Sequence, residues 1–125
     1  MKKINNVLDK LSKSKFRSSF KLNNKMKQYV NEKGVNIVKE HTYDFINKRL
    51  KPKCIANDGK QTPCKQVHPT FIAQHACACC CRGCLEKWHG ISKDKELTEE
   101  EVNYIVNLLM KWIDKQMKEK WYYDT

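Results

Sequence analysis

The clearest hydrophobic pattern lies in the last third of the chain. Apolar residues recur there at intervals of three and four from Val102 to Met117, as expected for one face of a helix. Thr98 precedes this run and Glu101 stands three positions later, which is the spacing of an N-terminal capping box. The pattern predicts a helix over about 99–119 whose apolar face packs in the core.

The start of the chain carries a shorter apolar stripe among lysines. Its members lie at helical spacing: Ile4, Val7, Leu8 and Leu11. This spacing predicts a basic amphipathic helix. We therefore divide the chain into an N-terminal basic amphipathic segment over 1–13 and a single globular domain over 14–121.

Two more helices are predicted in the first half. One spans about 24–32, with an asparagine at its N-cap position and Gly34 as its stop. The other spans about 35–50, and Pro52 ends it. A fifth helix is expected to begin near Cys80.

Residues 51–70 contain all three prolines and the turn sequence Asn57-Asp58-Gly59, which predicts a long loop. The apolar run Thr70–Ala73 that follows is compatible with a strand, although no second strand is evident. The expected fold is therefore mainly α: a small single domain of four to five helices, a long loop containing cysteine and histidine, and at most a short strand pair.

The length of 125 residues suits one domain, and the net charge is +11. This whole excess lies in residues 1–53, where Phe16 and Phe20 alternate with basic residues. Such a surface can bind nucleic acid, but it can equally be a solvated basic face. The second interpretation is favoured because 22 of the 25 basic residues are lysine, whereas nucleic-acid sites favour arginine.

Membrane insertion and export are not expected from the sequence. No apolar run approaches the ~20 residues of a membrane-spanning helix. The basic opening is interrupted by Asn5, Asn6 and Asp9, so it lacks the apolar region of a secretory signal. A cytoplasmic location is the expectation.

Seven cysteines are present, and five of them lie within the eight residues 77–84. Their odd number and close spacing do not suit disulfides, and in a reducing compartment metal ligation or thiol chemistry is expected instead. The candidate ligands are the imidazoles and thiols that can converge on the start of the cysteine-rich helix: His68, His75, Cys80, Cys81 and Cys84.

Zinc is the metal that such a mixed set of imidazole and thiolate ligands favours, and an iron–sulfur cluster is the alternative. Two functions remain open. The chain can be a binding module, for nucleic acid through its basic half, or a metal-dependent enzyme of hydrolase type that uses a centre of His68, His75 and Cys84. No established catalytic motif decides between them.

A long stretch of the sequence resembles a known family. It comprises Asn57–Pro63, His68-Pro69, Phe71–Ala76 and Cys80–His89. This pattern is similar to that of the bacterial family numbered 4186 among the domains of unknown function, over about residues 14–118. The resemblance implies that Cys80, Cys81 and Cys84 are the family's sulfurs and that Cys77 and Cys79 are additions. It implies no activity.

Overall fold

A computed structural model describes residues 2–53 and 58–119. These residues contain no strand and form seven helices: α1 (Lys2–Ser12), α2 (Lys15–Ser18), α3 (Asn24–Lys33), α4 (Val35–Arg49), α5 (Pro69–Ala76), α6 (Arg82–His89) and α7 (Glu99–Lys118). The predicted mainly α fold is confirmed. The single turn α2 and the short helix α5 are the two helices that the sequence pattern did not indicate.

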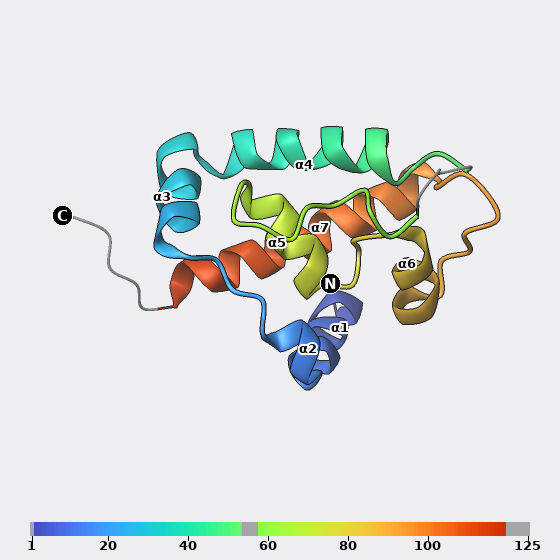
Figure 1. Cartoon of the computed structure of the whole chain (residues 1–125), viewed down its shortest axis with the longest axis horizontal. Coiled ribbons are helices and arrows are strands. Elements are labelled where there is room, and N and C mark those ends of the chain that lie inside the picture. The colour runs from blue at the N-terminus through green and yellow to red at the C-terminus, as the bar shows by residue number, and fades with distance from the viewer. Residues whose placement is uncertain (1, 54–57, 120–125) are drawn as a thin grey trace.

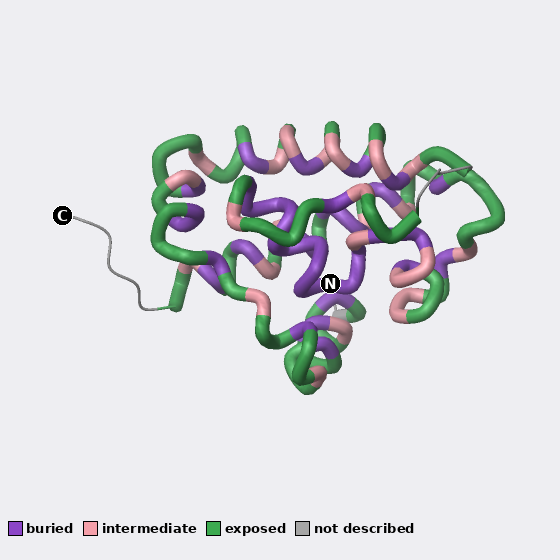
Figure 2. Tube along the Cα trace, viewed as in Figure 1, coloured by how far each residue is buried: buried purple, intermediate pink, exposed green. Residues whose placement is uncertain are grey.

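Helix α5 lies in the centre of the fold, between α4 and α7 (Figure 1). Every residue of α5 is buried, which makes it the one helix that is purple along its length in Figure 2. Helices α4 and α7 also contact each other, so the core is formed by three mutually packed helices. The position of α5 explains why even its polar residues Thr70, Gln74 and His75 are buried and why it has no exposed polar face.

The amphipathic helix α1 packs on α2 and α7. Its stripe is buried in the same core as the rest of the protein, with Ile4 4%, Leu8 6% and Leu11 3% exposed. The N-terminal segment therefore contributes apolar surface to the common core.

Several predicted helix ends are confirmed. The Asn23 side chain caps α3 by accepting from the Met26 N–H at 2.9 Å, and Gly34 ends that helix with φ of 90°. Thr98 and Glu101 form the expected capping box of α7. These ends follow local rules of backbone hydrogen bonding, which is why the sequence predicts them well.

The segment Thr70–Ala73 was expected to be compatible with a strand, and that expectation is wrong. It forms most of α5, which starts after His68 and has Pro69 in its first turn. The His68 ring nitrogen Nδ1 accepts from the Thr70 N–H at 3.0 Å and so caps the helix. Proline suits the first turn because a backbone N–H at that position has no partner within the helix, so its absence costs no hydrogen bond.

The loop between α4 and α5 has no helix or strand among its described residues, as expected. Cys54 and Asn57, which belonged to the predicted loop and turn, lie outside the described residues. No helix in the described ranges is both long enough and apolar enough to cross a bilayer.

Candidate metal centre

The five residues 77–81 connect α5 to α6 and carry four cysteines. Ala78 has φ of 58° and stands in the left-handed region, so the chain turns sharply after α5. The turn is closed by the Cys79 N–H, which donates to the Gln74 carbonyl oxygen at 2.8 Å. It delivers Cys80 and Cys81 to the start of α6.

Three sulfurs meet at this point. The Sγ atoms of Cys80, Cys81 and Cys84 all lie within 4.8 Å of one another, and those of Cys80 and Cys84 are 3.7 Å apart. Cys81 is buried, whereas Cys80 and Cys84 are half-buried. Since a Zn–S bond is about 2.3 Å long, two thiolates on a tetrahedral zinc lie about 3.8 Å apart. The Cys80–Cys84 separation fits this geometry.

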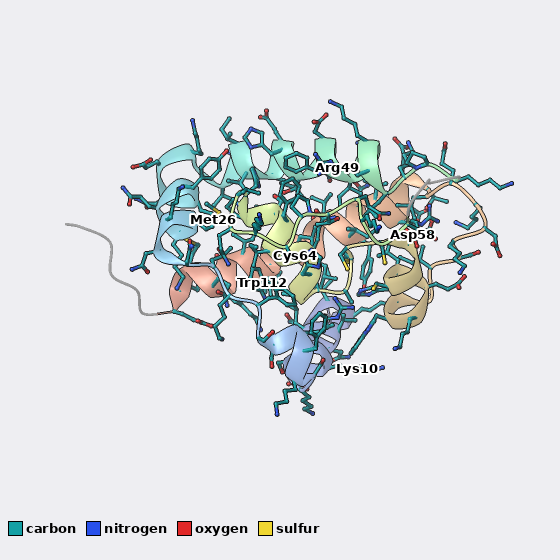
Figure 3. The ribbon with its side chains drawn as sticks, viewed as in Figure 1. Lys10, Met26, Arg49, Asp58, Cys64 and Trp112 are labelled. Carbon is teal, nitrogen blue, oxygen red and sulfur yellow. The ribbon has the colours of Figure 1, made fainter. Side chains whose placement is uncertain are left out.

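The cluster forms the N-terminus of α6, where the first four backbone N–H groups have no partner within the helix and three of them bond to side chains. Asp58 from the preceding loop accepts from two of them: Oδ1 from Arg82 at 2.9 Å and Oδ2 from Gly83 at 3.1 Å. The Cys81 sulfur accepts from the third, the Cys84 N–H, at 3.4 Å. Figure 3 shows Asp58 beside α6. Negative charge is favoured at this end of a helix by the helix dipole.

Asp58 and Cys81 carry shifted pKa values at this helix end. Burial opposes ionisation of Asp58, but the hydrogen bonds from Gln61, Arg82 and Gly83 outweigh it and lower the pKa of the carboxyl. Burial raises the pKa of the Cys81 thiol to about 12, although the Cys84 N–H opposes the rise. A bound cation would reverse this effect, because a coordinating thiol loses its proton.

Arg17 supplies a positive charge to the cluster from the other end of the chain. Its Nη2 donates to the Cys84 sulfur at 3.2 Å, and its Nη1 donates to the His75 carbonyl oxygen at 2.7 Å and to the Cys80 sulfur at 3.7 Å. Burial disfavours the charged guanidinium, but its contacts with the two thiols outweigh burial and raise the pKa of Arg17. The guanidinium therefore remains charged against two sulfurs.

The His75 ring lies beside this group but not within it. Its Nε2 is 3.1 Å from the carbonyl oxygens of Thr62 and Pro63 and 3.5 Å from the Cys64 sulfur. Both carbonyls are acceptors, so Nε2 carries the proton and Nδ1 holds a lone pair. Phe20 stacks on the ring at 5.3 Å. In the described part of the chain, no hydrogen-bond partner of Nδ1 is found.

The structure places His68 in a different cluster. Its Nε2 lies 3.1 Å from His41 Nδ1, and its ring contacts those of Tyr29, Phe45 and Phe71. Because Nδ1 accepts from the Thr70 N–H, the proton of the neutral ring resides on Nε2, which donates to His41. Both ring nitrogens are thus engaged in hydrogen bonds, and the structure does not bring His68 to the three thiols.

The remaining described cysteines differ from the cluster in their surroundings. Cys77 and Cys79 are fully buried, and burial raises the pKa of each thiol. The Cys79 sulfur faces His89 Nε2 at 3.6 Å, but that ring already bonds the Cys77 carbonyl oxygen at 2.8 Å. Cys64 is exposed. Neither of the two buried thiols belongs to the group of three.

Sequence reasoning did not identify Arg17 as part of the site, nor Asp58 as the cap of α6. A signal for Arg17 was present: it is one of three arginines in a chain with 22 lysines. Arginine suits positions where a planar fork contacts several acceptors, and Arg82 occupies another such position. Its buried guanidinium donates to four carbonyl oxygens, those of Leu50, Pro52, Ser92 and Lys95.

Comparison with known proteins supports the resemblance seen in the sequence. Residues 5–114 match a family described as Domain of unknown function (DUF4186). This range includes Arg17, the long loop and all three cysteines of the cluster. No solved structure matches the chain. Since the match spans most of its length, the chain belongs to the DUF4186 family.

Proposed function

We propose that this domain binds one zinc ion through Cys80, Cys81 and Cys84. The observation that carries the proposal is the convergence of three sulfurs within 4.8 Å, with Cys80 and Cys84 at a separation suited to tetrahedral zinc. The Arg17 guanidinium beside Cys80 and Cys84 would offset part of the negative charge of a group of three thiolates on zinc.

The donor set supports zinc over the other metals considered. Thiolates do not suit Ca²⁺ or Mg²⁺, which prefer oxygen ligands. A four-iron cluster takes four thiolates, and only three sulfurs converge among the described residues. Cys77 and Cys79, the nearest sulfurs along the chain, are fully buried elsewhere in the core.

His75 is the fourth ligand that we propose. Carbonyl oxygens hold the proton on Nε2, so the lone pair on Nδ1 is free to bind a metal. The His75 backbone and the cluster share Arg17 as a hydrogen-bond donor, which keeps them adjacent. The ring would have to move toward the sulfurs, because His75 is not within the 4.8 Å group. His68 has no comparable lone pair and is not proposed as a ligand.

The metal is proposed to serve structure rather than catalysis. The loop over 58–64 is fastened to the cluster by Asp58, by Thr62, whose hydroxyl donates to the Cys80 carbonyl oxygen at 2.9 Å, and by the His75 contacts. A metal on Cys80 would therefore hold this loop, α5 and α6 together. The hydrolase alternative needed His68 at the same centre, and no contact supports that placement.

Elemental analysis of protein purified without added metal tests the proposal. We expect close to one zinc per chain, with iron and copper far lower. Cys84→Ser should lose most of the zinc. Cys64→Ser should keep it, because Cys64 is outside the group of three and the Thr62 and Pro63 carbonyl oxygens still contact His75 Nε2 without its sulfur. Protein without near-stoichiometric zinc, and with a melting curve that a chelator leaves unchanged, would contradict the proposal.

A second candidate function is nucleic-acid binding by the basic half of the chain. One observation favours it: the Phe16 ring is 61% exposed, and exposed lysines surround it in sequence at positions 10, 13, 15 and 21. An exposed aromatic ring among cations can stack on a base while the lysines contact phosphates. Such binding would make the zinc domain a binding module for single strands.

Titration with a labelled single-stranded oligonucleotide at several salt concentrations tests this second function. Binding should weaken as salt rises, with a log–log slope of about −0.7 per phosphate contact. Phe16→Ala should weaken binding while leaving the salt slope unchanged, because it removes stacking and no charge. If wild type and Phe16→Ala bind equally and both lose binding at physiological salt, the second function is wrong and the basic half is a solvated face.

A further inference from the structure

We propose that Cys80 and Cys84 form a disulfide when the protein meets a peroxide, and that this bond expels the metal. The inference rests on the proposed zinc site and assigns it a mode of regulation. It follows from the arrangement of the sulfurs, because the two Sγ atoms are in direct contact at 3.7 Å. Both residues are half-buried, so a small oxidant can reach them.

Arg17 distinguishes these two thiols from the others. Its guanidinium contacts the Cys84 sulfur at 3.2 Å and the Cys80 sulfur at 3.7 Å, and no contact with Cys81 is found in the described part of the chain. One guanidinium therefore bridges these two sulfurs, which lie 3.7 Å apart. The Cys81 sulfur instead accepts the Cys84 N–H and is buried. Oxidation should therefore select the Cys80–Cys84 pair.

The reaction balances with hydrogen peroxide as the oxidant. The Cys84 thiolate attacks one peroxide oxygen: an S–O bond forms, the O–O bond breaks, and the hydroxide released takes a proton to become water. The Cys80 thiolate then attacks the Cys84 sulfur: the S–S bond forms, the S–O bond breaks, and a second water leaves after protonation. Two thiols lose two electrons, and one peroxide becomes two waters.

Loss of the metal follows from the ligand count. The disulfide consumes two of the three proposed thiolate ligands, and Cys81 and His75 alone are a poor site for zinc. Reduction by a dithiol would restore both thiolates and the site. The same three sulfurs would thus hold zinc under reducing conditions and release it under oxidising ones.

Tryptic mapping is well suited to test this, because trypsin cleaves after Arg82 and separates the two cysteines. Cys80 then lies in peptide 66–82 and Cys84 in peptide 83–87. Chelator-treated protein is exposed to hydrogen peroxide, its remaining thiols are alkylated under denaturing conditions, and it is digested. We expect the two peptides to be joined, and fragmentation to place the bond on Cys80 with Cys81 alkylated.

Two further arms complete the experiment. Cys81→Ser is the matched control, because Cys81 lies in the same peptide as Cys80. In this variant, peptides 66–82 and 83–87 should still be joined by a disulfide. One equivalent of zinc should slow formation of the bond about tenfold, and a chromophoric chelator should detect zinc release in step with it. Three results would overturn the inference. They are alkylated Cys84 at every peroxide dose, a disulfide that involves Cys81, and a link to the Cys64 peptide 61–65.

The zinc content of the untreated protein separates this inference from the proposed function. If the protein contains zinc and keeps it in peroxide, and Cys84 is recovered alkylated, the metal proposal stands and the proposed redox regulation is wrong. Protein that contains no zinc but forms the bond would remove the metal proposal and with it the release of metal.

Discussion

The guanidinium of Arg17 donates to the sulfur of Cys84 at 3.2 Å across 67 positions of sequence. This contact ties the single turn α2 to the first turn of α6. It also brings a positive charge to a group of three thiols that would carry a net negative charge once zinc had replaced their protons. Arg17 would thus act on the proposed metal centre through its charge without being a ligand.

Replacing Arg17 should weaken zinc binding. In Arg17→Gln, we expect affinity to fall by about 10- to 100-fold, because a hydrogen bond to a charged group is worth about 1.5–3 kcal/mol. Arg17→Lys should have an intermediate affinity, since it keeps the charge but not the fork. Competition with a chromophoric chelator measures this. Arg49→Gln is the control and should bind as wild type does. The Arg49 guanidinium donates to the Gln61 carbonyl oxygen and lies over the Phe45 and Phe71 rings, and it contacts no sulfur in the part of the chain that the structure describes.

His68 should make stability depend on pH. Burial lowers the pKa of His68 to about 4, and the neighbouring His41 ring contributes to the decrease. Between an unfolded value of 6.5 and this folded value, the unfolded chain binds a proton that the folded chain does not. The contribution of His68 is therefore complete above pH 6.5 and is lost as the pH falls from 6.5 toward 4.

The variant His68→Asn isolates this effect, because asparagine can cap α5 but does not titrate. Urea unfolding of both proteins at pH 7.5 and pH 5, with chelator present, should show the larger loss of stability in wild type. Chelator is required because metal binding to thiols is itself pH-dependent. An equal loss of stability in the two proteins would show that His68 is not the titrating group.

Arg82 should resist even conservative replacement. Its guanidinium is 2% exposed and donates to four carbonyl oxygens in two separate loops. Lysine cannot reach all four, so Arg82→Lys should lose about 2 kcal/mol or more of unfolding free energy. Denaturant unfolding measures this loss. Arg49→Lys is the matched control, and a similar small effect in both variants would refute the role given to Arg82.

The N-terminal helix should be needed for stability. Leu8 is 6% exposed in the common core, so Leu8→Ala should lower the unfolding free energy by about 2–4 kcal/mol. Val35→Ala, at a position 58% exposed, should change it by less than about 0.5 kcal/mol. If the two variants unfold at the same denaturant concentration, residues 1–13 form a separable segment and the domain starts after them.

The sequence predicted the helices that have local end signals. Asn23, Gly34 and Thr98 act through bonds to residues three or four positions away, so spacing alone reveals them. Helix α5 was not predicted, because it is buried on all sides and its sequence shows no helical period. Its N-cap is also a histidine, which is outside the usual set of capping residues.

The candidate site was only partly predictable for a similar reason. Cys80, Cys81 and Cys84 are neighbours along the chain, so their spacing indicated a shared site. Arg17 and Asp58 reach α6 from distant segments, and no local pattern encodes such contacts. The placement of His68 depended on the direction of α5, whose start fixes the ring against His41 instead of the thiols.

The three thiols of the cluster lie within five consecutive positions, 80–84. A denatured chain keeps these donors close together, so under the proposed zinc site it would retain affinity for the ion. Stabilisation by a ligand depends on the difference between its affinities for the native and denatured states. Zinc should therefore raise the melting temperature less than its affinity for the native protein alone would imply. If the zinc proposal holds, a nascent chain would be able to bind the ion before α7 has been synthesised.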